Sequence, residues 1–271
     1  MTEFALAAPL LLTTGLWGVE SANQAIVQMR VSQIAILIAD NASRVGEESL
    51  LGEVKLYESD VNDTFYGAGI QMGWDMDLFE HGRVILSSLE VVPGTDDQQY
   101  IHWQRCKGKK VHNSSYGDTG DGTVTMIDGM GPAGEEIYAQ SGEAVMFVEV
   151  VYDYQPLVGS AFTAVDEISA TSAFNVRNNR DLTQVYQRDA DNPDTVSSCS
   201  TFDSFPAMTF DSGGSGGYGG TSSTSGGSSS SSGSSSGGAS SSSSGGASSS
   251  GGATSTSSGG ASSSGGASSG G

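Results

Sequence analysis

Three side chains of metal-binding type lie close together near the middle of the sequence. His102, Cys106 and His112 form an H-x3-C-x5-H spacing. Imidazole and thiolate groups bind zinc, but a zinc site needs three or four ligands held in fixed positions, and this spacing supplies no fourth. His102 alternates with the apolar neighbours Ile101 and Trp103, as in a strand. We therefore predict a polar strand face here and no metal site.

A second group of possible ligands follows in the segment DTGDG, which contains Asp118 and Asp121. These carboxylates resemble part of a calcium loop. A complete loop also needs a third oxygen ligand and a distal bidentate glutamate, and Asp128 and Glu135 do not stand at that spacing. Asp118 and Asp121 are weak calcium candidates, and the pattern favours a solvated acidic loop.

Glycine-rich and nucleophile motifs point to no catalytic chemistry. The GMGPAG loop of residues 129–134 does not join a strand to a helix in a βαβ unit, so it is not expected to bind phosphate. The sequence contains no Gly-x-Ser-x-Gly motif and no convincing Ser, His and Asp order. We predict that the protein is not an enzyme and needs no cofactor.

The charge balance is strongly acidic. The chain carries 31 acidic and 11 basic residues, for a formal charge of −20. This balance argues against partners that need Lys and Arg patches, namely nucleic acid and anionic lipid head groups. The one basic cluster, the RCKGKK segment of residues 105–110, is expected to be a solvated hairpin end.

Composition divides the chain into an anchor, a globular region and a tail. From Ser212 to the end, only Gly, Ser, Ala, Thr and Tyr218 occur. Such a low-complexity segment buries too little to offset its ordering entropy, so 212–271 is predicted to be disordered. Residues 25–211 are long enough for one globular domain with its own core.

The two cysteines leave two alternatives open. Cys106 and Cys199 would form one disulfide in an exported domain, tying the C-terminal segment to the body. In a cytosolic protein they would be two free thiols. The compartment therefore decides between the two states.

The N-terminal part predicts a membrane anchor over residues 1–24. Phe4–Val19 carries no charge, and its 16 residues span about 24 Å as a helix, against about 30 Å for a hydrocarbon core. Polar flanking residues would extend the span into the interfaces. A cleavable signal peptide is disfavoured because Glu3 stands where a basic region is expected.

The same helix is expected to continue far beyond the anchor. An apolar stripe at alternating spacings of four and three predicts an amphipathic helix to about residue 45: Val27, Val31, Ile34, Ile38, Ala42 and Val45. The whole rod, from about Glu3 to Arg44, would measure roughly 60 Å. Pro9 and Gly15 are expected to be local kinks or weak points.

The region after this helix predicts a small antiparallel sheet. Residues 46–82 show no clean period, and only short helical turns are expected around Glu47–Ser59. Strands are predicted at Arg83–Val92, Gln99–Arg105 and Glu143–Gln155, with a long loop over 107–142. The last strand alternates in a way that predicts one buried face. The expected class is α+β, with three or four strands packed on the stripe of the helix.

Three segments together resemble one known family. Residues 2–12 read TEFALAAPLLL; residues 82–89 read GRVILSSL and are followed by IHWQR at 101–105; and residues 143–157 read EAVMFVEVVYDYQPL. Their order and spacing over roughly residues 2–190 resemble the TadE/TadG-like pseudopilins of the Tad (tight adherence, Flp) pilus system. That family shows a Glu-Phe-Ala-Leu-x-x-Pro run at the head of a long apolar helix.

The resemblance implies a pilin-like fold and a minor pseudopilin that takes part in pilus assembly and adherence. Glu3, Phe4 and Pro9 match the assembly motif, in which the glutamate meets the N-terminal amine of a neighbouring subunit. Implied partners are other pilus subunits, an inner-membrane assembly platform and the lipid bilayer. The implied location is the bacterial inner membrane, with one span and a periplasmic domain, and the extracellular pilus as a second location.

The sequence departs from the family at its start. Family members are cut by a prepilin peptidase after a glycine shortly before the glutamate, whereas Met1 stands two residues before Glu3 without such a leader. We expect a truncated gene model, with the peptidase as a further partner if a leader exists upstream. The alternative function is an anchored extracytoplasmic adhesive or surface protein without a filament role.

Overall fold

The computed structural model describes residues 2–48, 52–73, 75–163 and 165–205. The chain divides into two units, residues 1–210 and 211–271, and the fold below belongs to the first. The tail predicted for 212–271 lies outside the described residues.

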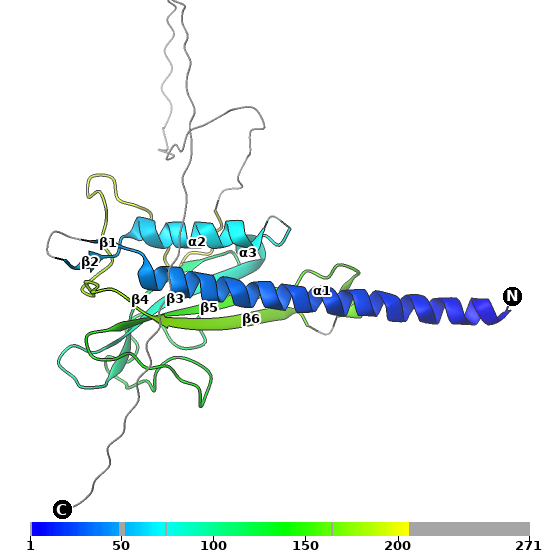
Figure 1. The fold of residues 1–271 in the computed structure, drawn as a ribbon, viewed down its shortest axis with the longest axis horizontal. Helices are drawn as coiled ribbons and strands as arrows, with labels where there is room; N and C mark the ends of the chain where they lie inside the picture. Colours follow the sequence, from blue (N-terminus) through cyan, green and yellow to red (C-terminus); the bar gives the residue numbers. More distant parts are fainter. Residues whose placement is uncertain (1, 49–51, 74, 164, 206–271) are drawn as a thin grey trace, which may run out of the picture. The chain divides into compact units, whose positions relative to one another are not determined.

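A single long helix dominates the structure and confirms the predicted rod (Figure 1). Helix α1 spans Thr2–Arg44 and passes without interruption through Pro9 and Gly15, where the sequence predicted kinks. The predicted stripe is the buried face: Val27, Val31, Ile34, Ile38 and Ala42 are all buried. Periodic apolar side chains packed on a sheet therefore stabilise the second half of α1.

The sheet has four antiparallel strands in the order β4-β3-β5-β6. Its strands are β3 (Gly82–Val91), β4 (Gln99–Lys107), β5 (Ala144–Asp153) and β6 (Glu167–Asn175). The first three confirm the predicted strands within one or two residues. Strand β6 was not predicted, because its run of Ser, Ala and Thr carries little apolar alternation.

Helix α2, Glu58–Met72, replaces the short turns expected in this region. Its buried residues include Val61, Phe65, Ala68 and Met72, which recur at helical spacing. Two internal glycines lower its helix propensity by about 1 kcal/mol each, so packing against α1 must stabilise it. The smaller elements are β1 (Glu47–Glu48), β2 (Val54–Lys55), α3 (Leu78–His81) and the 3-10 helix η1 (Ser160–Phe162).

Both faces of the central strands are covered, so the prediction of one buried face was wrong. Side chains such as Leu86 and Val148 pack on one face with α1 and α2. The long loop over 108–142 covers the other face and adds a second apolar cluster: Leu89, Ile101, Met130, Ala139, Val145 and Phe147. The sequence hid this cover because the loop contributes scattered single apolar residues instead of a periodic run.

Candidate functional site

The first half of α1 presents large apolar side chains to the outside. Phe4 is 77% exposed and Leu11 is 68% exposed, and the other strongly exposed apolar side chains of this part are Leu10, Leu12, Leu16, Trp17 and Val19. The predicted assembly residues Phe4 and Pro9 both lie on this exposed segment. The side chain of Glu3 lies outside the described residues. Among the described residues, no helix has the combined length and apolar character of a membrane span.

A buried carboxylate marks the point where α1 meets the rest of the domain. Glu20 is 0% exposed, although it directly follows the apolar segment. Its carboxylate accepts hydrogen bonds from the Tyr154 hydroxyl and from the backbone N–H groups of Leu157 and Val158, the last at 2.7 Å. Asn23 donates to the Tyr154 hydroxyl at 2.9 Å. These bonds satisfy a charge that would otherwise be costly to bury.

The Glu20 contacts mark where the exposed N-terminal part of α1 ends and its packed part begins. Glu20, Asn23 and Tyr154 connect α1 to the chain after β5, so the loop that starts at Pro156 is tied to the helix. These contacts lie within the range 1–24 that the sequence analysis assigned to the anchor. The uninterrupted run of exposed apolar side chains therefore ends at Val19 in this structure, and beyond it one face of α1 is packed on the domain.

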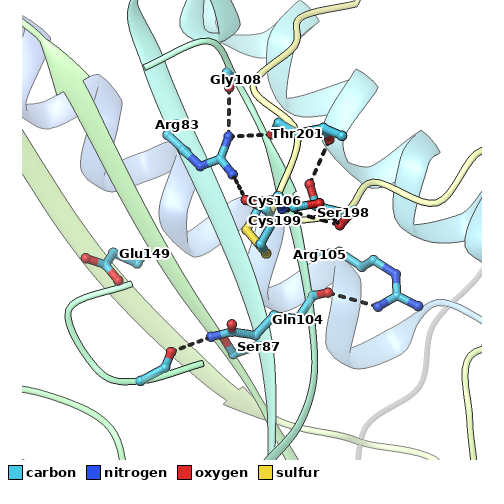
Figure 2. The surroundings of a disulfide bond; sticks show 12 residues. Arg83, Ser87, Gln104, Arg105, Cys106, Gly108, Glu149, Ser198, Cys199 and Thr201 are labelled. Carbon is cyan, nitrogen blue, oxygen red and sulfur yellow. Dashed lines mark hydrogen bonds between the residues drawn. A yellow bond between two sulfur atoms is a disulfide. The ribbon is translucent and has the colours of Figure 1, made fainter. Parts of the chain in front are cut away.

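The C-terminal segment is fastened to the opposite edge of the sheet by the disulfide Cys106–Cys199 (Figure 2). The predicted pairing is therefore confirmed. The Cys106 N–H also donates to the Ser197 carbonyl at 2.8 Å, and the Gly108 N–H donates to the Asp203 carbonyl at 2.8 Å. The disulfide joins residues that are 93 positions apart, so it closes a large loop of the chain.

Arg83 reinforces this C-terminal attachment from inside the domain (Figure 2). Its side chain is almost fully buried, and its guanidinium donates to the carbonyls of Gly108, Cys199 and Thr201 at 2.7–3.0 Å. It also lies over the Phe202 ring, 4.1 Å from the centroid. Burial lowers the pKa of Arg83. A buried cation thus joins two backbone segments, the end of β4 and residues 199–201, by charge-assisted hydrogen bonds to three carbonyls.

The predicted solvated basic cluster is wrong. Arg105 pairs with the buried Glu58 at the start of α2 through two hydrogen bonds. Lys107 pairs with Asp203 at 2.8 Å. The cluster belongs to the end of β4 and not to a hairpin turn, so its side chains meet elements on both sides of the strand: Lys109 pairs with Glu80, and Lys110 pairs with Asp153 and Glu167.

The three side chains of the apparent zinc pattern have separate partners. A β-bulge between β3 and β4 leaves His102 outside the ladder, and its Nδ1 lies 3.0 Å from a carboxylate oxygen of Glu90. His112 contacts Glu149 at 3.1 Å, while Cys106 is bonded to Cys199. The structure therefore does not bring this pattern together.

The weak calcium candidates form a turn. The Asp121 carboxylate accepts a hydrogen bond from the Asp118 N–H at 2.9 Å, which is the bond of a local turn. Among the described residues, no three His, Cys, Asp or Glu side chains gather as metal ligands.

Every basic side chain of the chain is engaged within the fold. All 11 Lys and Arg residues lie in the described part and contact a carboxylate, a carbonyl or an aromatic ring: Arg30, Arg44, Lys55, Arg83, Arg105, Lys107, Lys109, Lys110, Arg177, Arg180 and Arg188. The excess of carboxylates is therefore left to the surface. The absence of a nucleic-acid partner stays a prediction, and this distribution favours it.

Sequence reasoning missed Glu20, Arg83 and Arg180. Glu20 had a visible signal, since it is the first charge after the apolar run of α1. Arg180 donates to the carbonyls of Ala42 and Val45 and so caps the C-terminal end of α1. Burial lowers its pKa to about 10. Nothing local marks Arg83 or Arg180, because their acceptors are backbone carbonyls far away in sequence.

No family model, no curated protein and no solved structure matches this chain.

Removing the disulfide is expected to destabilise the domain. Opening a 93-residue separation should lower the free energy of unfolding by about 4–5 kcal/mol in the chain-entropy model. Urea denaturation of the double variant Cys106→Ala, Cys199→Ala measures this loss. The wild type in reducing agent should show a similar loss, and the variant should not respond to reductant. An unchanged urea midpoint in both the double variant and the reduced wild type would contradict the stabilising role of the disulfide.

The Glu90–His102 pair should make stability depend on pH. The hydrogen bond to Glu90 raises the pKa of His102 above its usual value of about 6.5. The stabilisation is therefore complete below about pH 6.5 and is lost as pH rises through the higher folded-state pKa. His102→Gln should lack this component of the pH profile. An NMR titration that places the His102 pKa below the unfolded value would contradict the assignment.

Proposed function

We propose that this protein is an assembly subunit whose exposed apolar helix is inserted in a membrane or in the core of a membrane-rooted filament. The observation that carries the proposal is the division of α1 at Glu20. Val27–Ala42 is packed on the sheet, while Phe4–Val19 presents apolar side chains outward. A contiguous run of large exposed apolar side chains marks a contact with lipid or protein.

Two features support a minor pseudopilin over other anchored proteins. The long helix with its second half on a small antiparallel sheet is the arrangement expected of a pilin-like fold. The Glu3-Phe4-Ala5-Leu6 run and Pro9 stand at the head of this helix. The proposed setting is the bacterial inner membrane, with the domain on the periplasmic side, where a disulfide is stable. Its proposed partners are other pilus subunits and their assembly platform.

Apolar helices of this kind can serve both stages of such a role. In the bilayer they would hold the subunit before assembly, and in a filament they would pack side by side. The acidic domain would face water in both states. The uncharged surface of residues 4–19 fits either environment, since lipid tails and packed helices are both apolar.

Two lysines in the exposed helix should remove the anchor. Leu11→Lys with Leu12→Lys costs about 6 kcal/mol if both positions enter hydrocarbon. The variant should move from the membrane fraction to the soluble fraction of cells. A matched control is Val111→Lys with Val124→Lys, because both valines are strongly exposed on the loop beyond β4. Equal fractionation of both variants with the wild type would contradict the proposed insertion.

Glu3→Ala tests the filament part of the proposal separately. If Glu3 pairs with the amine of a neighbouring subunit, the variant should remain in the membrane fraction while surface filaments become scarce. Electron microscopy of shed filaments, with immunolabelling of the domain, measures this. Normal filaments in the variant would favour the anchored adhesive or surface protein without a filament role.

A further inference from the structure

The two edges of the sheet are treated differently by the fold. The edge of β4 is covered near one end by residues 197–203 and near the other by residues 120–127. Strand β6 is the other edge, and among the described residues no backbone group pairs with its outer side. Unpaired N–H and C=O groups of an edge strand form a template for another strand.

Strand β6 also lacks the features that usually protect an edge. It pairs with β5 over nine consecutive residues without a register shift, so no bulge bends it away. Its only charge is Glu167 at the first position, and it contains no proline. Ser169 and Thr171 are exposed and small. A natural edge of this length is normally blunted by charge, proline or a bulge.

An exposed apolar stripe on α1 accompanies this edge. Ile26, Met29 and Ile36 are each about half exposed. Their spacing places them on the side of the helix that ends at Asp40. Asp40 pairs with Arg177, two residues beyond β6, at 3.1 Å. The apolar stripe therefore lies on the same side of α1 as Asp40, the residue that contacts the chain just after β6.

The strand and the helix also match in direction and length. Near the start of β6, the Asp166 carbonyl accepts a hydrogen bond from the Tyr154 N–H, and the Tyr154 hydroxyl contacts Glu20 of α1. Near its end, the Arg177 N–H donates to the Ser43 carbonyl. The helix covers about 35 Å between these points and the strand about 36 Å. Figure 1 shows β6 lying beside α1 along this stretch.

We propose that the outer edge of β6 and the Ile26–Met29–Ile36 stripe form a docking surface for an extended segment of a partner protein. The segment adds antiparallel to β6, as the four strands of the sheet do. Its side chains on the α1 side are apolar, because they face the stripe. Its C-terminal end is basic, because that end lies beside the exposed carboxylate of Asp166, whose neighbour Glu167 already pairs with Lys110.

A second copy of this chain fits the surface poorly. Two β6 edges related by a twofold axis would pair antiparallel, and β6 runs in the same direction as α1. The two apolar helices would then point in opposite directions. This step rests on the proposed function, which needs the helices of neighbouring subunits on one side. The other edge, β4, offers no alternative because it is covered.

A peptide of alternating Thr and Val that ends in two lysines is the probe for this surface. Fluorescence anisotropy with the full chain in detergent should show saturable binding, with slower amide exchange in β6. Met29→Asp with Ile36→Asp should weaken binding at least about tenfold, as expected for loss of central apolar contacts. The control Ile70→Asp changes an equally exposed isoleucine on α2 and should bind like the wild type within about twofold.

Two further peptides separate strand addition from other binding. A peptide N-methylated at alternate residues cannot pair with the edge and should not bind. A peptide ending in two glutamates should bind more weakly than the lysine peptide. Absence of binding, or equal binding of the N-methylated peptide, would overturn the proposal. Slow exchange of β6 amides without peptide, together with a dimer in sedimentation, would overturn it in favour of a second copy. Neither result depends on whether residues 4–19 insert in a membrane.

Discussion

The packing of one face of α1 on the sheet is the constraint on which the rest of the structure depends. Most helical stability comes from tertiary packing, and in the described part of the chain it is the second half of this 43-residue helix that is packed on the sheet and on α2. The Val27–Ala42 stripe supplies the core of the domain, Arg180 caps the helix end, and Glu20 closes the contact at the other limit. The described side chains from Phe4 to Val19 carry no such packing, and we propose that they meet a second environment.

The few basic side chains of the domain hold its long connecting segments in place. The fold engages each of its few basic side chains within the molecule, and the two arginines with the most buried roles bind carbonyls. Arg83 holds the C-terminal segment beside the disulfide, and Arg180 holds the chain after β6 against the end of α1. The remaining carboxylates leave an acidic surface, and like-charged surfaces repel one another. This repulsion fits the two proposed contact regions, the apolar part of α1 and the edge of β6, which carries one charge among its nine residues.

Periodic patterns made part of this structure predictable. The stripe of α1 and the positions of β3, β4 and β5 were predicted correctly, because long apolar elements repeat their apolar residues at fixed spacing. The alternation of β5 was misleading, since both of its faces are buried. Helix α2 carried the same signal at Val61, Phe65 and Met72, but glycines and acidic residues between them hid it. Strand β6 and the cover over the second face had no local signal, since small polar residues and scattered loop side chains acquire their places from tertiary contacts. The candidate site followed the same rule: the disulfide could be inferred from two cysteines, whereas Arg83 acts on distant carbonyls.

A nitroxide scan along α1 tests the central claim most directly, namely that one helix serves two environments with a border at Glu20. Single spin labels at positions 10–34 of the membrane-reconstituted protein report collisions with a water-soluble relaxation agent. The account predicts low collision rates at every position from 10 to 19, and beyond residue 20 a modulation with the helical period of 3.6 residues and minima at Val27 and Val31. The same periodic modulation extending through 10–19, with water-accessible positions among them, would contradict it.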